Sequence, residues 1–343
     1  MTTRDRISTS LLDWLLEPEN PIVRYLTLRD LLDRPPLDAE LAAARAAAHT
    51  SGLIPHILDE MQPEGYWIKP GYGYAPKYHG TVWSLILLGQ LGAESSQDAR
   101  IEHACAYLLE HALLKDGQFT ATGSAGTGNI DCLQGNLCAA LLDLGCTDQR
   151  LDRAFEWMAR SVTGEGIAPA TERHAPVRYY ASGKCAPGFA CSANNKLQCA
   201  WGAVKVMLAF SKLPRDRWTP LIERAIAVGR DFLFSVDPAL ALYPTGWSDK
   251  PSGNWWKFGF PVFYVTDLLQ NVEALVGLGY SDDPRLENAL NVIRRKQDES
   301  GRWALEYHYN NKTWLHVGTK NKPSKWVTLR ALRVLKDAAA SIN

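Results

Sequence analysis

The sequence of 343 residues has no excess of either charge and no long apolar run. Its 37 Lys and Arg residues balance 37 Asp and Glu residues, so no net field draws the chain to nucleic acid or to an acidic membrane. The longest apolar runs, such as residues 83–89, are far too short to cross a bilayer. These absences predict a protein that binds no nucleic acid and has no transmembrane segment.

The N-terminal segment 1–21 also lacks the apolar stretch and the small-residue cleavage site of a signal peptide. There are seven cysteines, an odd number, and in a chain with no export signal they indicate reduced thiols rather than disulfides. Together these features predict a cytoplasmic protein.

Alternation of apolar and polar residues, the sign of β-strands, is almost absent, whereas helical periodicity recurs along the whole chain. Six strongly apolar segments predict buried helices, and each follows a more charged segment that predicts an amphipathic helix. The apolar segments are 21–33, 77–92, 131–145, 196–212, 264–279 and 323–336, and the amphipathic segments are about 5–17, 37–60, 98–113, 148–163, 215–236 and 283–297.

Six pairs of one buried and one half-polar helix are what a ring with an inner and an outer wall requires. The sequence therefore predicts an all-α fold, an (α/α)6 toroid formed by residues 1–343 as a single domain. The long loops rich in Gly and aromatic residues join outer to inner helices, so they should gather at one end, around the mouth of the ring. An open solenoid of helical hairpins is the alternative, and closure is favoured because six pairs is the number at which such rings close.

Two short motifs resemble a known family. Residues 296–303, KQDESGRW, fit the Q-x3-G-x-W core of the QW motif of squalene and terpene cyclases, and residues 61–67, MQPEGYW, are a shorter version. The loop LKDGQF keeps the glycine but has Phe in place of Trp. The resemblance implies the α/α toroid shared by triterpene cyclases and the β-subunits of protein prenyltransferases.

Other motifs of this superfamily are missing from the sequence. It has neither the DxDD acid of protonating cyclases nor the DDxxD run of ionising terpene synthases, and it has no P-loop or GxGxxG fingerprint. A proton-initiated polyene cyclase is therefore disfavoured. Prenyltransferases hold zinc with an Asp and a Cys near one inner-helix start and a His from the next, and this chain has Asp131 and Cys132 adjacent to each other.

When the sequences of three predicted inner helices are aligned at their C-terminal ends, His79, Cys132 and Cys199 fall at equivalent positions of the first turn. The loop before the third helix adds two more thiols. Converging thiolates and an imidazole are typical zinc ligands. The predicted zinc ligands are Cys132, Cys199 and one or both of Cys185 and Cys191. With three protein ligands the ion keeps an open position, and with four the site is structural.

The roles of two neighbouring residues stay open at this point. His79 is a zinc ligand, a base, or a partner of Tyr78 or Asp131, and Asp131 is a helix cap, a zinc ligand or an acid–base group. The remaining cysteines carry no predicted role: Cys105 and Cys138 are core residues, and Cys146 lies in a loop. The predicted catalytic residues are Asp131, His79, Tyr78 and Asp267.

Aromatic and polar residues from the same loops predict an apolar pocket with a few polar groups, the usual build of a small-molecule site. Asp267 and Asn271 lie one helical turn apart, so they should share a face. The predicted substrate-binding residues are Tyr72, Tyr74, Trp83, Trp255, Trp256, Tyr264, Asn271, His308 and His316.

These features predict a zinc-dependent enzyme that acts on a hydrophobic small molecule, isoprenoids included, in the central cavity of the ring. Two alternatives remain. One is a metal-free lyase or isomerase of the dehydratase-isomerase type that uses Asp131 and His79 as acid and base. The other is a non-catalytic binding module in which the cysteines form a structural zinc clip.

Overall fold

The computed structural model describes residues 7–340, and most of them are helical. The α-helices are α1 (Thr9–Leu15), α2 (Pro21–Leu26), α3 (Ala39–Thr50), α4 (Leu53–Asp59), α5 (Thr81–Gln90), α6 (Ala99–His111), α7 (Ala125–Gly128), α8 (Asp131–Asp143), α9 (Arg150–Thr163), α10 (Ala200–Lys212), α11 (Pro220–Leu233), α12 (Leu268–Gly277), α13 (Glu287–Arg295) and α14 (Lys325–Ala340).

Other regular structure is short. The π-helical segment η2 (Thr27–Leu31) continues α2, and two-residue strands β1 (Gly259–Phe260) and β2 (Tyr307–His308) pair in parallel. The 3-10 turns are η3 (Pro187–Phe189), η4 (Ser192–Asn194), η5 (Arg215–Arg217), η6 (Gly253–Trp256) and η7 (Pro284–Leu286). The prediction of an all-α protein is confirmed for this part of the chain.

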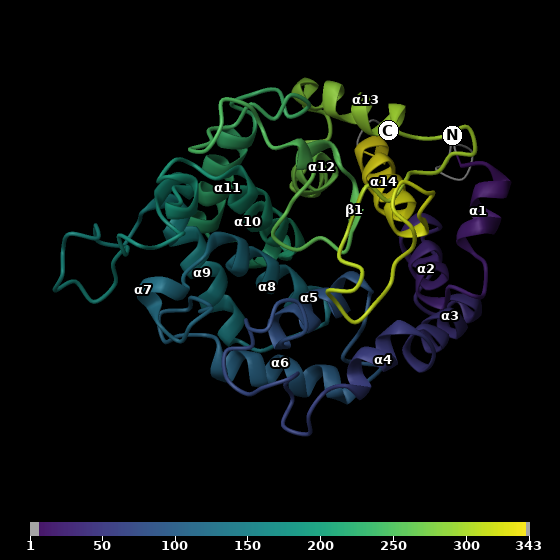
Figure 1. The fold of residues 1–343 in the computed structure, drawn as a ribbon, viewed down its shortest axis with the longest axis horizontal. Coiled ribbons are helices and arrows are strands. Elements are labelled where there is room, and N and C mark those ends of the chain that lie inside the picture. Colours follow the sequence, from purple (N-terminus) through teal and green to yellow (C-terminus); the bar gives the residue numbers. More distant parts are fainter. Residues whose placement is uncertain (1–6, 341–343) are drawn as a thin grey trace.

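The helices lie in two rows around a common centre (Figure 1). In the inner row α5, α8, α10, α12 and α14 each contact the next helix in that order, and α14 contacts α2. In the outer row α3, α6, α9, α11 and α13 each pack against an inner helix that is adjacent in sequence. Within residues 7–340, no helix is both long enough and apolar enough to cross a membrane.

The two rows differ in how they are buried. In the inner helix α5 every residue from 81 to 89 is buried, because helices α4, α6 and α8 and the loop residues Phe263 and Trp314 cover it. The outer helix α9 buries Leu151, Phe155, Met158 and Val162, which recur every three or four residues, and exposes its charged side chains. For these two helices, the contrast between an apolar and an amphipathic segment in the sequence predicted the correct row.

Several helix boundaries differ from the prediction. The outer segment 37–60 is two helices, because Gly52 has φ +88° and interrupts the helix between α3 and α4. The first outer segment is shorter than 5–17, and residues 5 and 6 lie outside the described residues. Inner helices α5, α10 and α12 begin about four residues later than expected. For α12 the reason is Asp267, whose carboxylate accepts the backbone N–H of Gln270 and caps the helix there.

The tryptophans of the two QW-like motifs make the same contacts in different parts of the chain. Trp67 Nε1 donates to the carbonyl of Ile57 at the end of α4 at 2.7 Å, and Trp303 Nε1 donates to the carbonyl of Ile293 near the end of α13 at 2.8 Å. Each tryptophan also donates its backbone N–H to a threonine of the following inner helix. The motifs thus tie an outer helix end to the next inner helix, satisfying helix-end carbonyls.

One loop passes near the centre of the helical rows. It contains β1, which lies beside α14 on the side that faces the centre in Figure 1. Gln90 of α5 makes two hydrogen bonds to Val262: its Nε2 donates to the Val262 carbonyl at 2.7 Å, and its Oε1 accepts from the Val262 backbone N–H at 2.8 Å. Arg330 of α14 donates to the carbonyl of Gly259 at 2.7 Å. The loop is therefore fixed to two inner helices, α5 and α14.

Candidate functional site

A cavity of about 600 Å³ lies where loops that precede four inner helices meet. Its wall comes from segments 74–77, 130–132, 184–201 and 241–264, which lead into α5, α8, α10 and α12. We call it the mouth cavity. For these four loops, the prediction that they gather around one opening is confirmed.

Glycines bring α8 and α10 close together on one side of the mouth cavity. A β-carbon on Gly135 would lie 2.3 Å from the carbonyl carbon of Lys205, and one on Gly202 would lie 3.0 Å from the β-carbon of Asp131. Only glycine permits this approach. It places the first turn of α8 directly beside Cys199, the N-cap of α10.

The segment before α10 runs alongside the start of α8. Ile130 and Lys184 form a parallel bridge, and the backbone N–H of Asp131 donates to the carbonyl of Lys184 at 3.2 Å. This pairing places Cys185, which is 1% exposed, next to Asp131. The Cys185 thiol donates a hydrogen bond to the Asp131 carboxyl.

A second pair of thiols meets across a narrow turn of the same segment. Ala190 and Gln198 form an antiparallel bridge, so Cys191 and Cys199 stand on neighbouring strands of the turn. Their thiols form a hydrogen bond with each other. Cys191 and Cys199 both line the mouth cavity, as does Cys132 from the first turn of α8.

Burial controls the protonation of the groups at the start of α8. Asp131 is 4% exposed, and burial raises its pKa to about 8 although the thiol of Cys185 opposes the shift. Burial also raises the pKa of Cys132 to about 12, against the attraction of Lys205. Both groups therefore hold their protons at neutral pH when nothing is bound.

Cys191 differs from the other thiols. The hydrogen bond from Cys199 lowers the pKa of Cys191, and the backbone N–H groups of Ala193 and Asn194 add to this against the effect of burial. The pKa of Cys199 is raised by the same contact and by burial. Cys191 is therefore the thiol of the site that ionises most readily.

The donor set suits a thiophilic metal ion. Four thiols and one carboxyl from two segments, 130–132 and 184–201, lie close together, and Oδ2 of Asp131 is buried without a hydrogen-bond partner. Soft thiolate ligands select ions such as Zn²⁺. Among the residues that the structure describes, no three His, Cys, Asp or Glu side chains are already arranged as a metal-ligand set. The donors are gathered but not yet arranged around an ion.

No protein-family model matches the sequence, and no curated protein matches it significantly.

The structure brings part of the predicted site together. Of the predicted zinc ligands, three line the mouth cavity and Cys185 lies directly behind them, against Asp131. Of the predicted substrate-binding residues, those on the cavity wall are Tyr74, Trp255 and Tyr264.

His79 and Tyr78 do not reach the thiols. Helix α5 begins only at Thr81, so both residues lie in the preceding turn. The His79 ring packs edge-on against Trp314 with centroids 4.7 Å apart, and Tyr78 stacks on Phe263 at 5.1 Å. The expected equivalence of His79 with Cys132 and Cys199 thus fails, because the turn before α5 directs these rings toward other aromatic residues.

Asp267 forms a buried ion pair and does not line the mouth cavity. It is 5% exposed at its side chain and binds Arg330 of α14, with Oδ2 2.9 Å from Nη1 and Oδ1 3.1 Å from Nη2. Asn271 is fully buried and donates to the hydroxyl of Tyr243 at 3.0 Å. Neither residue is on the wall of the mouth cavity.

The remaining predicted residues also lie elsewhere. Trp83 is fully buried in the core, and its indole donates to the carbonyl of Tyr74 at 2.6 Å. Trp256 donates to the carbonyl of Ala239, and Nδ1 of His308 accepts from a backbone N–H of its own loop. Tyr72 and His316 are exposed at the surface.

Several cavity residues were not predicted. The wall includes Trp201, Tyr243 and Trp247, and three lysines, Lys77, Lys184 and Lys250. Their signal in the sequence is weak, because single lysines in loops are usually solvated. Trp201 follows Cys199 by two residues, so its place in the first turn of α10 could have indicated it.

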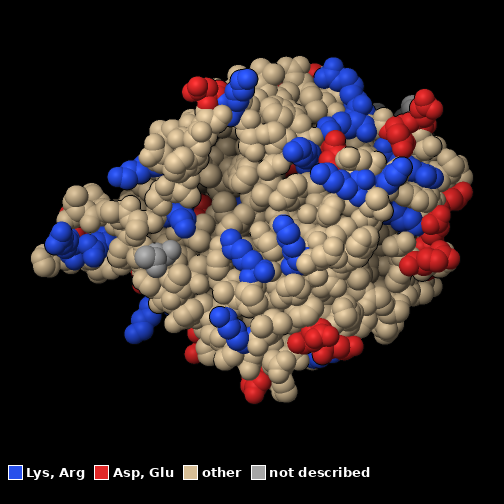
Figure 2. Space-filling view, in the orientation of Figure 1, with Lys and Arg blue, Asp and Glu red and all other residues tan. Residues whose placement is uncertain are grey.

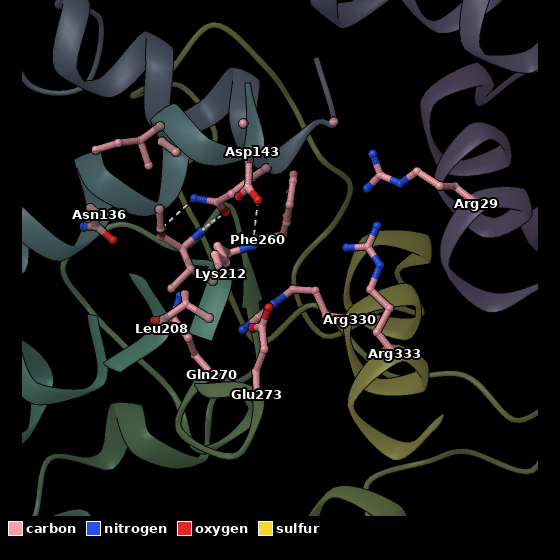
Figure 3. A pocket seen from close by; sticks show the side chains of 17 residues that line it. Arg29, Asn136, Asp143, Leu208, Lys212, Phe260, Gln270, Glu273, Arg330 and Arg333 are labelled. Atoms are coloured by element: carbon pink, nitrogen blue, oxygen red, sulfur yellow. Dashed lines mark hydrogen bonds and ion pairs between the residues drawn. The ribbon is translucent and has the colours of Figure 1, made fainter. Parts of the chain in front are cut away.

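A second cavity, of about 130 Å³, lies among the inner helices and is strongly charged (Figure 3). In Figure 3 the guanidinium groups of Arg29 and Arg333 extend toward each other. Lys212, the last residue of α10, donates to Asp143 of α8 at 2.8 Å. Lys212 at the C-terminus of α10 complements the helix dipole. It pairs with Asp143, and Arg29 and Arg333 both pair with Asp30. These cations are therefore already paired with carboxylates of the fold.

Proposed function

We propose that the protein is an enzyme that acts on a hydrophobic small molecule in the mouth cavity and uses a zinc ion held by the thiol cluster. We also propose that the chain is one closed α/α toroid of the kind shared by triterpene cyclases and prenyltransferase β-subunits. The two rows of paired helices and the repeated tryptophan contacts support the fold. The observation that carries the function is that three thiols line an aromatic cavity and a fourth, Cys185, lies directly behind them.

Several of the thiols would bind the ion together. Cys132, Cys191 and Cys199 would bind it from the cavity wall, and Cys185 would either complete the set or orient Asp131. A zinc ion with an open coordination position polarises a carbonyl or activates a bound water or thiol. The starts of α8 and α10 favour the negative charge of the ligands, because two helix N-termini point at the site.

The rest of the wall would bind the substrate and exclude water. Aromatic rings supply most of the apolar surface, which is the usual way a pocket of this size holds a small molecule. The buried Asp131 carboxyl would hold a proton beside the thiols at neutral pH. The aromatic wall residues are Tyr74, Trp201, Tyr243, Trp247, Trp255 and Tyr264.

Metal content tests the proposal directly. We expect near-stoichiometric zinc in tag-free protein by elemental mass spectrometry, and loss of zinc in Cys132→Ser and Cys199→Ser. Cys138→Ala is the control, because Cys138 is buried in the middle of α8 away from the cavity wall. Thermal unfolding separates the roles: a folded, zinc-free variant indicates a catalytic ion, and an unfolded one indicates a structural clip. Parent protein without metal contradicts the zinc proposal.

The state of Cys191 supports one metal-free candidate. Its thiolate is stabilised by Cys199 and by two backbone N–H groups, which is how nucleophilic cysteines are activated. In that case Cys191 would attack an electrophilic substrate directly. Rapid alkylation of Cys191 in metal-free protein, unchanged by chelators, would favour this candidate over the zinc enzyme.

A further inference from the structure

The mouth cavity carries several lysines and no carboxylate on its wall. Its wall includes three lysines, Lys77, Lys184 and Lys250, and no Asp or Glu residue. Two helix N-termini add positive potential at the same place, since α8 and α10 begin on the wall. An apolar cavity with several fixed cations attracts a ligand that is apolar and negatively charged.

Aromatic rings hold one of these cations in place. The Lys77 ammonium lies 5.1 Å from the ring centroid of Tyr74, 5.3 Å from that of Tyr264 and 5.6 Å from that of Trp83. All three distances are within the range of cation–π attraction, about 6 Å. The ammonium group of Lys77 is therefore held at the cavity wall and does not move freely in solvent.

None of the three ammonium groups pairs with a carboxylate, although Lys184 attracts the Cys191 thiolate. Among residues 7–340, none of the three makes a hydrogen bond or ion pair through Nζ. Four lysines elsewhere in the fold are held by carboxylates: Lys212 by Asp143, Lys296 by Glu306, Lys325 by Glu17 and Lys336 by Asp33. The lysines of the mouth cavity are thus left available for a ligand.

The distribution of charge over the surface agrees with this. Figure 2 shows Lys and Arg side chains around the middle of the face that it presents, whereas Asp and Glu side chains lie mostly toward the edge. The molecule is neutral as a whole, so the positive middle is a local feature. Such a local field draws anions toward the centre of the ring and raises their rate of association.

We propose that the ligand of the mouth cavity is an amphipathic anion, an apolar molecule with a carboxylate or phosphate group at one end that Lys77, Lys184 and Lys250 bind. The inference rests on the proposed function and names its substrate class. The apolar body would lie against the aromatic wall, and the cavity of about 600 Å³ holds a chain or ring system of roughly ten to fifteen carbons.

Direct binding separates charge recognition from apolar burial. The probes are decanoate, decyl phosphate and decanol at concentrations below micelle formation, titrated against the tryptophan fluorescence of the wall residues. We expect both anions to bind at least tenfold more tightly than decanol, and added salt to weaken only the anions. Stronger binding of decyl phosphate would assign the natural head group to phosphate, and stronger binding of decanoate would assign it to carboxylate.

Lysine variants locate the anion. Lys77→Gln, Lys184→Gln and Lys250→Gln should each weaken binding of the preferred anion about fivefold and leave decanol binding unchanged. Lys115→Gln is the matched control, because Lys115 is an exposed, unpaired lysine of another loop that does not line the cavity.

Three results would overturn the inference. If decanol binds as tightly as the anions, or if the three variants behave like Lys115→Gln, the lysines do not recognise a ligand. Binding of none of the probes has the same meaning. Zinc content of the same preparations distinguishes this failure from that of the proposed function: zinc without anion preference rejects only the amphipathic anion, and anion preference without zinc rejects only the metal.

Discussion

The backbone of Lys205 lies so close to Gly135 that no side chain fits between them. A β-carbon on Gly135 would be 2.3 Å from the carbonyl carbon and 2.4 Å from the carbonyl oxygen of Lys205. This contact between α8 and α10 is what puts the thiols at the starts of the two helices within reach of each other. A single glycine in the middle of a helix therefore determines the geometry of the site at its end.

We expect Gly135→Ala to destabilise the protein and to disrupt the thiol cluster together. Forcing the helices apart costs about 1–3 kcal/mol, the usual range for overpacked cores. Urea denaturation would measure the loss, and metal content would report the cluster. Gly253→Ala is the control, since nothing lies within 4 Å of a β-carbon there. Equal stability of the two variants would show that the helices adjust without cost.

The buried pair of Asp267 and Arg330 predicts a second effect. Both side chains are less than a tenth exposed, so removing one leaves the charge of the other without a partner in the interior. We expect Asp267→Ala to lower the free energy of unfolding by about 3–5 kcal/mol. Chemical denaturation followed by circular dichroism measures this change.

A double variant distinguishes the pair from a catalytic role. Asp267→Ala combined with Arg330→Met removes both charges, so it should recover most of the stability that the single variant loses. Recovery of stability together with normal zinc content would confirm that Asp267 holds α12 to α14. If the double variant is no more stable than the single one, the ion pair is not the reason for the burial of Asp267.

The helical pattern was predictable because burial determines which positions of a helix carry apolar residues. Inner helices such as α5 are apolar all round, and outer helices such as α9 are apolar on one face. The positions of Cys132 and Cys199 followed from the same pattern, because a residue at a helix start takes its place from the helix. Cys185 was predicted at the site only because it lies close to Cys191 in the sequence of the same loop.

The failures of prediction have one common cause, which is the path of the loops. Nothing in the sequence shows that the turn before α5 sends His79 against Trp314, or that Asp267 meets Arg330 from the far end of the chain. The lysines of the mouth cavity were missed for the same reason. A lone lysine in a loop looks solvated until the structure shows that Lys77 is surrounded by three aromatic rings.

Lys205 predicts how stability depends on pH. Burial lowers its pKa from 10.5 to about 7, so above neutral pH the folded protein holds it uncharged against Gln270. Between about pH 7 and pH 10 the unfolded chain binds a proton that the folded protein does not, so this residue makes stability rise with pH. The slope from one such group is at most about 1.4 kcal/mol per pH unit.

Lys205→Met isolates this contribution, because methionine is similar in length and carries no charge. We expect the stability of the parent relative to Lys205→Met to increase from pH 7 to pH 9, measured by urea denaturation in reducing buffer at each pH. The cysteines titrate in both proteins, so their effect cancels in the difference. A difference that stays constant with pH would mean that Lys205 titrates in the same way in both states.

A pair of cysteines outside the mouth cavity predicts selective reactivity. Cys105 of the outer helix α6 is buried, whereas Cys146, just after α8, is partly exposed. The hydrogen bond from the Cys105 thiol lowers the pKa of Cys146, and a backbone N–H of Asp148 adds to the effect. Cys146 therefore carries more thiolate at neutral pH than an unperturbed cysteine, and the thiolate is the reactive form.

We expect iodoacetamide at pH 7 to alkylate Cys146 well before the buried Cys105 and Cys138, as measured by peptide mass spectrometry over time. Cys105→Ala removes the donor, so the pKa of Cys146 should rise and its alkylation should slow several-fold, even though the smaller side chain leaves more room for the reagent. Cys138→Ala is the control and should leave the rate unchanged. Faster alkylation in Cys105→Ala would show that access rather than charge limits the reaction, and would contradict the contact between the two thiols.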